Sequence, residues 1–153
     1  MFHMVDDDKL VLEALSSILK TLGYECKMFS SPAAYLKYMQ SSDYQPPIAL
    51  LSDATMPDMN GFELLKTVHQ HHPEIRTAII SGYVDSMDES QEHVCVYLRK
   101  PFLIPALESM LKAFTLCHKD GCDPERFGCA AISDKTLSGK DQWRCPLMNR
   151  GKK

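Results

Sequence analysis

Five residues with charged or hydroxyl side chains stand at the ends of short apolar runs. Asp6 and Asp7 follow one such run, Asp53 follows a second, Ser81 ends a third and Lys100 comes soon after a fourth. If these runs are parallel strands, their carboxyl ends open onto one edge of a sheet, where functional groups of α/β proteins gather. The sequence therefore predicts carboxylates, a hydroxyl and an ammonium group at a single site.

The chemistry of such a site is the binding of a hard cation and of phosphate. Clustered carboxylates repel one another, which favours a bound cation, and carboxylate oxygens with room for water are typical of Mg²⁺ sites. We expect Asp7 and Asp53 to hold the ion, with Asp6 nearby or acting through a water molecule. Open coordination positions would then accept phosphate oxygens.

Asp53 is the predicted nucleophile, because a carboxylate can accept a phosphoryl group covalently and the run at 48–52 is apolar on both faces, as a central strand is. Lys100 would place a positive charge beside the phosphoryl oxygens, and Ser81 would donate a hydrogen bond to one of them. A single Asp at a strand end is usually a turn or helix-cap residue. The combination of several carboxylates, a hydroxyl and an ammonium group at strand ends favours a functional site.

The elements that must position these residues follow from the hydrophobic periodicity. Short apolar runs alternate with longer amphipathic segments, which indicates βα units. Strands are expected at 2–5, 26–29, 48–52, 77–80 and 94–98, and helices at 9–22, 32–40, 62–71, 85–92 and 103–116. The predicted fold class is α/β, a doubly wound five-stranded parallel sheet with five helices.

Four segments, in this order, resemble the motifs of the response-regulator receiver domain. They are VDDD at 5–8, LSDATMPDMNG at 51–61, ISG at 80–82 and YLRKPF at 97–102. The resemblance covers about residues 2 to 116. It implies a flavodoxin-like sheet with strand order 2-1-3-4-5, which the periodicity alone does not give.

The same resemblance implies roles for individual residues. Asp53 would be the phosphoacceptor, Asp6 and Asp7 the acidic pair for Mg²⁺, and the Thr55 backbone carbonyl a further ligand of the ion. Lys100 matches the lysine of the family pattern.

Ser81 matches the switch hydroxyl of the family, and Tyr97 the aromatic residue whose burial changes on phosphorylation. The resemblance implies a phosphorelay response regulator that receives phosphate from a sensor histidine kinase or phosphotransfer protein. It would then alter its affinity for a downstream protein. Such a protein is a signalling switch and not a metabolic enzyme, with only self-phosphorylation and slow self-dephosphorylation. The region 92–95 departs from the family pattern in a part of the chain that usually forms the output face.

Competing chemistries have little support in the sequence. A Gly-rich phosphate loop, a Gly-x-Ser-x-Gly elbow and a His-Glu-x-x-His motif are all absent. A haloacid-dehalogenase-like phosphatase would need a second acid two residues after the nucleophile, where this chain has Thr55.

Charge divides the 153 residues into two parts. Residues 1–116 carry net −6 and form the predicted receiver domain, whereas residues 117–153 carry net +3 and form a basic, Cys-rich tail. Because that tail is short, we expect no conventional output domain and no direct DNA binding. The longest apolar runs are too short to cross a membrane, so the expected location is the cytoplasm.

The tail raises an alternative function. Cys117, Cys122, Cys129 and Cys145 are enough soft ligands for a tetrahedral Zn²⁺ site, although the gaps between them are irregular. In that interpretation the chain is a metal- or redox-sensing interaction module, and the receiver core is its scaffold. A loose tail with incidental thiols is the favoured interpretation of the same residues.

Overall fold

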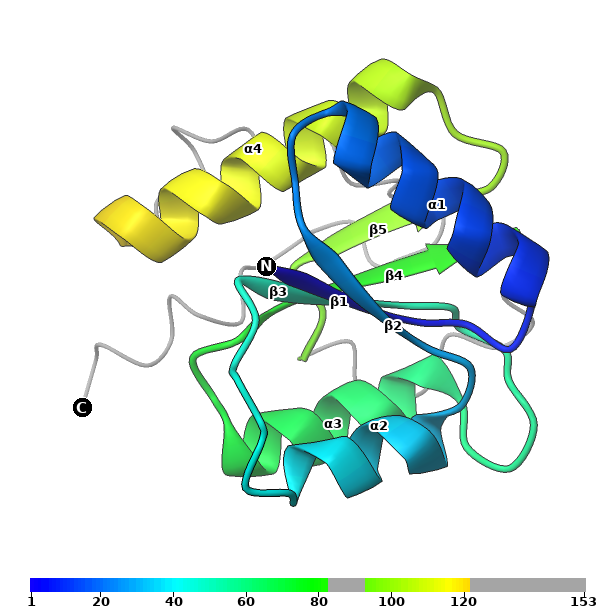
Figure 1. Cartoon of the computed structure of the whole chain (residues 1–153), viewed down its shortest axis with the longest axis vertical. Coiled ribbons are helices and arrows are strands. Elements are labelled where there is room, and N and C mark those ends of the chain that lie inside the picture. The colour runs from blue at the N-terminus through cyan, green and yellow to red at the C-terminus, as the bar shows by residue number, and fades with distance from the viewer. Residues whose placement is uncertain (83–92, 122–153) are drawn as a thin grey trace, which may run out of the picture.

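The computed structural model describes residues 1–82 and 93–121, with a sheet of five parallel strands at the centre (Figure 1). The strands are β1 (Phe2–Val5), β2 (Cys26–Phe29), β3 (Ala49–Ser52), β4 (Arg76–Ser81) and β5 (Val96–Arg99). They lie in the order β2-β1-β3-β4-β5, and every neighbouring pair is parallel. The predicted fold class and strand order are confirmed.

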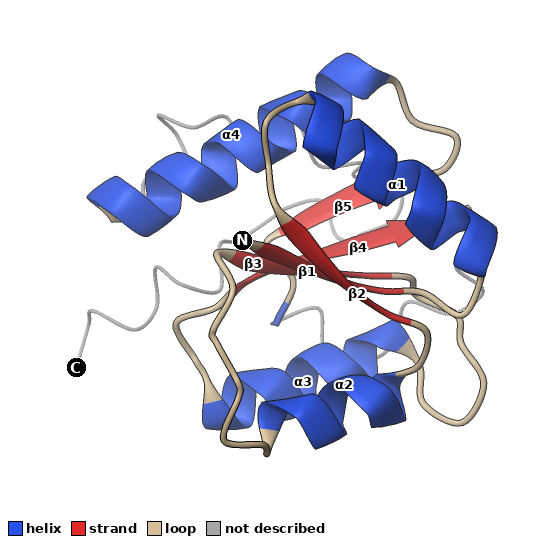
Figure 2. Cartoon of the chain, viewed as in Figure 1, coloured by secondary structure: helices blue, strands red, loops and turns tan. Residues whose placement is uncertain are grey.

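Helices cover both faces of the sheet (Figure 2). They are α1 (Lys9–Thr21), α2 (Pro32–Met39), α3 (Gly61–His71) and α4 (Ile104–Asp120). Helices α1 and α4 lie over one face, and α2 and α3 over the other. The short helix predicted for 85–92 lies outside the described residues.

The helices begin where the sequence supplies capping groups. The Asp8 side chain accepts hydrogen bonds from two backbone N–H groups of the first turn of α1, and the Ser31 hydroxyl accepts one at the start of α2. Helix α3 has a full capping box, because the Asn60 side chain accepts from the Glu63 N–H and the Glu63 carboxylate accepts from the Asn60 N–H. These caps fix the residues at which the helices begin. After the strand that precedes each of these helices, the chain therefore turns back over the sheet at a defined position.

Two cores, one on each face, hold the layers together. Strands β1 and β3 are buried at every position, as central strands of a parallel sheet are. Along β1, Phe2 and Met4 pack in the core beneath α1 and α4, whereas Val5 packs in the core beneath α2 and α3. The carboxyl ends of β1 and β3 are therefore fixed from both sides.

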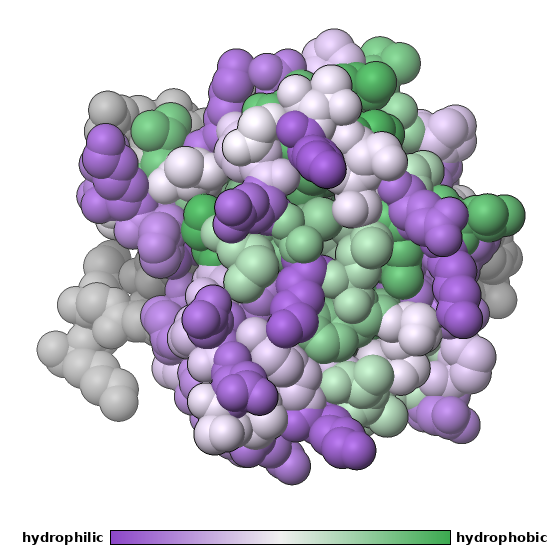
Figure 3. Space-filling view, viewed as in Figure 1, coloured by the Kyte–Doolittle hydropathy of each residue, from purple (hydrophilic) through white to green (hydrophobic). Residues whose placement is uncertain are grey.

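Strand β2 forms one edge of the sheet, and apolar groups show there between the hydrophilic outer surfaces of the helices (Figure 3). Met28 is half-exposed on this strand, and the Lys27 ammonium lies 4.1 Å from the centre of the Tyr38 ring. A lysine on an open edge strand hinders pairing with another chain.

The last helix corrects two expectations. It was predicted to end near residue 116, but α4 continues to Asp120. Cys117, predicted to belong to a loose tail, is only 5% exposed and packs in the core. Its carbonyl accepts a hydrogen bond from Arg76 Nη2 at 2.7 Å, and its Sγ accepts one from Arg76 Nε at 3.2 Å. A contact between β4 and the helix end thus stabilises a turn that local sequence does not mark.

Candidate functional site

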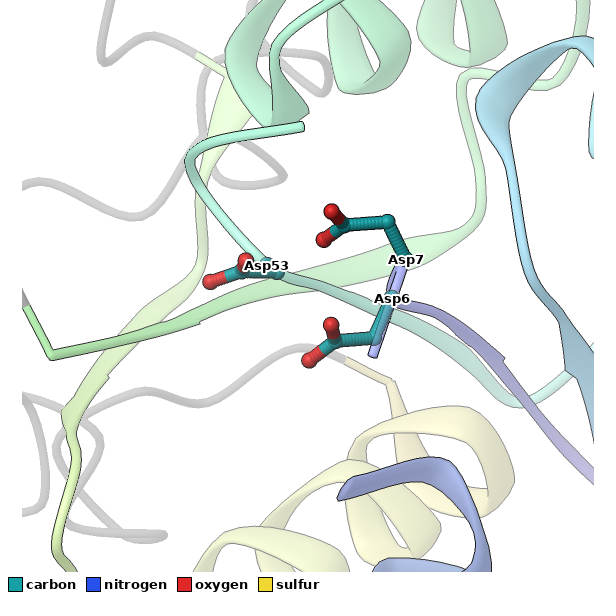
Figure 4. A group of neighbouring side chains, drawn as sticks. All are labelled: Asp6, Asp7 and Asp53. Atoms are coloured by element: carbon teal, nitrogen blue, oxygen red, sulfur yellow. The ribbon is translucent and has the colours of Figure 1, made fainter. Parts of the chain in front are cut away.

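Three carboxylates meet at the carboxyl edge of the sheet, from the ends of two neighbouring strands (Figure 4). Val5 of β1 pairs with Ser52 of β3, so the next residues, Asp6 and Asp53, come out side by side. One carboxylate oxygen from each of Asp6, Asp7 and Asp53 lies within 4.8 Å of the others. The predicted acidic cluster is therefore brought together by the parallel register.

Asp6 is the most deeply placed of the three carboxylates. It is 4% exposed, and both of its oxygens have partners. Oδ1 accepts a hydrogen bond from the Asp8 backbone N–H at 2.9 Å, and Oδ2 accepts one from Lys100 Nζ at 2.9 Å. Asp8 itself uses its side chain to cap α1 and lies outside the carboxylate cluster.

Lys100 brings the positive charge that the sequence predicts. Its Nζ lies 2.9 Å from Asp6 Oδ2 and 3.7 Å from Asp53 Oδ1. The backbone places it there, because the Lys100 N–H donates to the Ser81 carbonyl at 2.9 Å and so continues the pairing of β4 with β5. The peptide bond between Lys100 and Pro101 is cis.

The surroundings of Asp53 disfavour its charged form. Burial is the main reason that its pKa rises to about 6, and repulsion from Asp6 and Asp7 adds to the rise. The Lys100 ammonium and the Ala54 N–H act in the opposite direction but do not cancel it. One ammonium group therefore leaves excess negative charge in the cluster.

That donor set fits Mg²⁺. The groups available are hard carboxylate oxygens from Asp6, Asp7 and Asp53, close enough to share one ion, and three carboxylates beside one ammonium group leave net negative charge. Thr55, predicted to add a backbone carbonyl ligand, follows Asp53 by two residues in the segment that leads to α3.

The two predicted switch residues are both buried. Ser81 ends β4 and is 2% exposed, and Tyr97 lies on the neighbouring strand β5 at 1% exposure. Tyr97 packs in the core beneath α2 and α3, with its ring centre 6.4 Å from that of Phe62, and burial raises its pKa. In this structure the tyrosine is thus turned inward.

Backbone contacts of the phosphoacceptor candidate were not predicted from the sequence. The Asp53 N–H donates to the Val5 carbonyl at 3.0 Å, and the Asp53 carbonyl accepts from Ser52 Oγ at 2.9 Å. The Gly61 N–H donates to the Ala54 carbonyl at 2.9 Å. Gly61 is the last residue of the motif at 51–61, and spacing in the sequence does not show which backbone atom it contacts.

The zinc set predicted for the tail is not assembled in the described part of the chain. Cys117 lies in the core, while Cys122, Cys129 and Cys145 lie outside the described residues. Nothing among the described residues supports the metal- or redox-sensing alternative.

A family model described as the response regulator receiver domain matches residues 2–112. The chain belongs to the response regulator receiver domain family. The receiver domain is a signalling domain.

Two curated relatives are response regulators of larger size. The DNA-binding transcriptional regulator NtrC of Escherichia coli is 34% identical over 102 residues, which cover 65% of this chain and 21% of NtrC. The response regulator protein TodT of Pseudomonas putida is 29% identical over 158 residues, covering 99% of this chain and 67% of TodT. This receiver therefore spans about a fifth of NtrC and two thirds of TodT.

Solved receiver structures share the fold. The response regulator TrrA of Thermotoga maritima, solved in complex with Mg(2+)-BeF, superposes with a TM-score of 0.66 at 21% identity, and the match covers 74% of this chain and 96% of that one. Among the described residues, no helix of this receiver is long and apolar enough to cross a membrane.

Proposed function

We propose that this receiver is a phosphorelay response regulator that accepts a phosphoryl group on Asp53 from a phosphohistidine of a sensor kinase or phosphotransfer protein. The observation that carries the proposal is the position of Asp53, beside Asp6 and Asp7 and 3.7 Å from the Lys100 ammonium. Family membership and the Mg(2+)-BeF complex of TrrA support it.

The transfer is an in-line displacement at phosphorus. A carboxylate oxygen of Asp53 forms a new P–O bond while the P–N bond to the donor imidazole breaks, and the imidazole nitrogen leaves with the bonding pair and takes up a proton. Mg²⁺, held by Asp6, Asp7 and Asp53 with the Thr55 carbonyl, would supply charge neutralisation when bound. Lys100 offers an ammonium to the phosphoryl oxygens.

The signal would then pass through the buried residues of β4 and β5. The Ser81 hydroxyl is proposed to donate to a phosphoryl oxygen, and Tyr97 to change its packing in response. Output to a downstream protein and a cytoplasmic location complete the proposal. The predicted absence of DNA contact is weakened by NtrC, which is named as DNA-binding and matches over only a fifth of its length.

The test is phosphorylation with Mg²⁺ and a small phosphodonor such as acetyl phosphate or phosphoramidate, followed by intact mass. We expect a gain of one phosphoryl group that hydroxylamine removes, as it does from an acyl phosphate. Asp53→Asn should gain none, whereas Asp43→Asn, which removes an exposed carboxylate, should behave as wild type. Labelling of the Asp53→Asn protein at the wild-type level would refute the assignment.

A further inference from the structure

The start of α3 lies against the backbone of the phosphoacceptor candidate, and only a residue without a side chain fits there. A Cβ built on Gly61 would overlap the Asp53 carbonyl oxygen and would lie 3.0 Å from both the Asp53 carbonyl carbon and Ile79 Cδ1. Real Cβ atoms essentially never come closer than this to another heavy atom, so part of the structure would have to move. The atom in the way belongs to the main chain and cannot simply rotate aside.

Both sides of this close approach are held by further contacts. Helix α3 is held by its capping box and by buried side chains, including Phe62 and Leu65. The Asp53 carbonyl accepts a hydrogen bond from the Ser52 hydroxyl at 2.9 Å, and the Ala54 carbonyl accepts one from the Gly61 N–H at 2.9 Å. Gly61 thus bounds the space in which the Asp53 carbonyl lies.

We propose that Gly61 is a positioning residue for the Mg²⁺ site, fixing the main chain at Asp53–Thr55 so that its oxygens face Asp6 and Asp7. The inference rests on the proposed function, because it assigns a role to Gly61 in the same site. Mg²⁺ demands near-ideal octahedral geometry at about 2.0–2.1 Å, so a small displacement of one ligand is costly. A side chain at position 61 would displace Asp53 and the Thr55 carbonyl together.

The experiment measures Mg²⁺ affinity of the full chain by isothermal titration calorimetry, with folding checked by circular dichroism. We expect Gly61→Ala to weaken Mg²⁺ binding by roughly tenfold or more, the range seen when groups that orient metal ligands are removed. The matched control is Gly23→Ala. Gly23 has φ +90° with no atom near its would-be Cβ, so this change strains a turn remote from the site. It should lower stability and leave Mg²⁺ affinity unchanged.

A second pair of variants distinguishes the effect of the Asp53 carbonyl from that of Ile79 Cδ1, the other atom that a Cβ on Gly61 would meet. Ile79→Val removes the Cδ1 atom that a Cβ on Gly61 would meet, so Gly61→Ala with Ile79→Val has room on that side and folds more readily. We expect the double variant to regain stability while its Mg²⁺ affinity stays low, relative to Ile79→Val alone. Recovered affinity would show that packing against Ile79, and not the Asp53 carbonyl, was responsible.

The outcomes for this inference and for the proposed function are distinct. If wild type binds Mg²⁺ and is phosphorylated but Gly61→Ala binds Mg²⁺ within about twofold of wild type, the positioning role is wrong and the proposed function stands. If wild type neither binds Mg²⁺ nor gains a phosphoryl group, the proposed function fails and the role of Gly61 fails with it.

Discussion

The charge of Asp53 should destabilise the metal-free protein, and removing it should make the fold more stable. The pKa of this carboxyl rises from 3.8 to about 6 on folding, because burial and two neighbouring carboxylates disfavour its charged form. The folded state therefore holds this proton more tightly than the unfolded state. Between the two pKa values, stability is lost as pH rises, and the full cost is present above about pH 6.

The size of the effect follows from the same shift. A rise of about two pKa units at about 1.4 kcal/mol each gives roughly 3 kcal/mol, and the side chain is only 15% exposed, so solvent screening removes little of it. Asp53→Asn keeps the shape without the charge. We expect its unfolding free energy at about pH 7.5 to exceed that of wild type by up to roughly 3 kcal/mol, and by about half as much near pH 5.

The assay is urea unfolding in EDTA at both pH values, with Asp43→Asn as the control. Asp43 is exposed, so removing its charge should change stability by no more than about 0.5 kcal/mol. An Asp53→Asn protein that is no more stable than wild type at about pH 7.5 would refute the electrostatic reasoning.

Addition of Mg²⁺ tests whether the higher unfolding free energy of Asp53→Asn comes from relieving charge repulsion in the carboxylate cluster. A ligand at about 100 times its Kd stabilises the folded state by about 2.7 kcal/mol, so Mg²⁺ should bring wild type close to the Asp53→Asn protein. The variant has lost one carboxylate of the cluster and should respond much less. An equal response in both proteins would mean that the ion binds elsewhere.

Three further changes probe the scaffold. The pKa of His3 is lowered to about 4, mainly by burial, so the contribution of His3 to the unfolding free energy should fall by about 3 kcal/mol as pH drops from 6.5 through 4, opposite in sign to the Asp53 effect over that range. An NMR titration of His3 near 6.5 would contradict this. Arg76→Ala should cost about 1–3 kcal/mol in urea unfolding through its lost hydrogen bonds to Cys117, whereas Lys112→Ala, in an exposed helix pair, should cost a few tenths. Asn60→Ala should cost about 0.5–2 kcal/mol by the same measurement, through loss of the α3 cap.

The sheet could be predicted from the sequence because each strand is a short apolar run bounded by turn residues. The bounds of β1 and β2 agree with prediction, since polar residues end both runs. Strand β4 is longer than predicted, from Arg76 to Ser81, because both of its polar ends continue the ladder. Periodicity marks apolar positions and misses polar ones that pair through the backbone.

The candidate site was predicted by type and place, but its internal contacts were not. That Asp6, Asp7, Asp53 and Lys100 meet follows from strand ends in a parallel sheet. Lys100 lies closer to Asp6 than to Asp53 because of the path that the chain takes after β5. The spacing of residues in the sequence does not predict that path. The end of α4 was missed for a similar reason, because it depends on a side chain 41 residues away in sequence.

The Lys100 ammonium does not neutralise the negative charge of the carboxylate cluster. Three carboxylates and the Lys100 ammonium leave two excess negative charges, and a dication would cancel both. Under the proposed function, phosphorylation would replace the single negative charge of Asp53 with a phosphoryl group carrying about two. Lys100, whose Nζ lies 2.9 Å from Asp6 Oδ2 and 3.7 Å from Asp53 Oδ1, would then be attracted toward the new charge. Because the Lys100 backbone N–H donates to the Ser81 carbonyl, we expect that attraction to act on the end of β4, where the proposed switch begins.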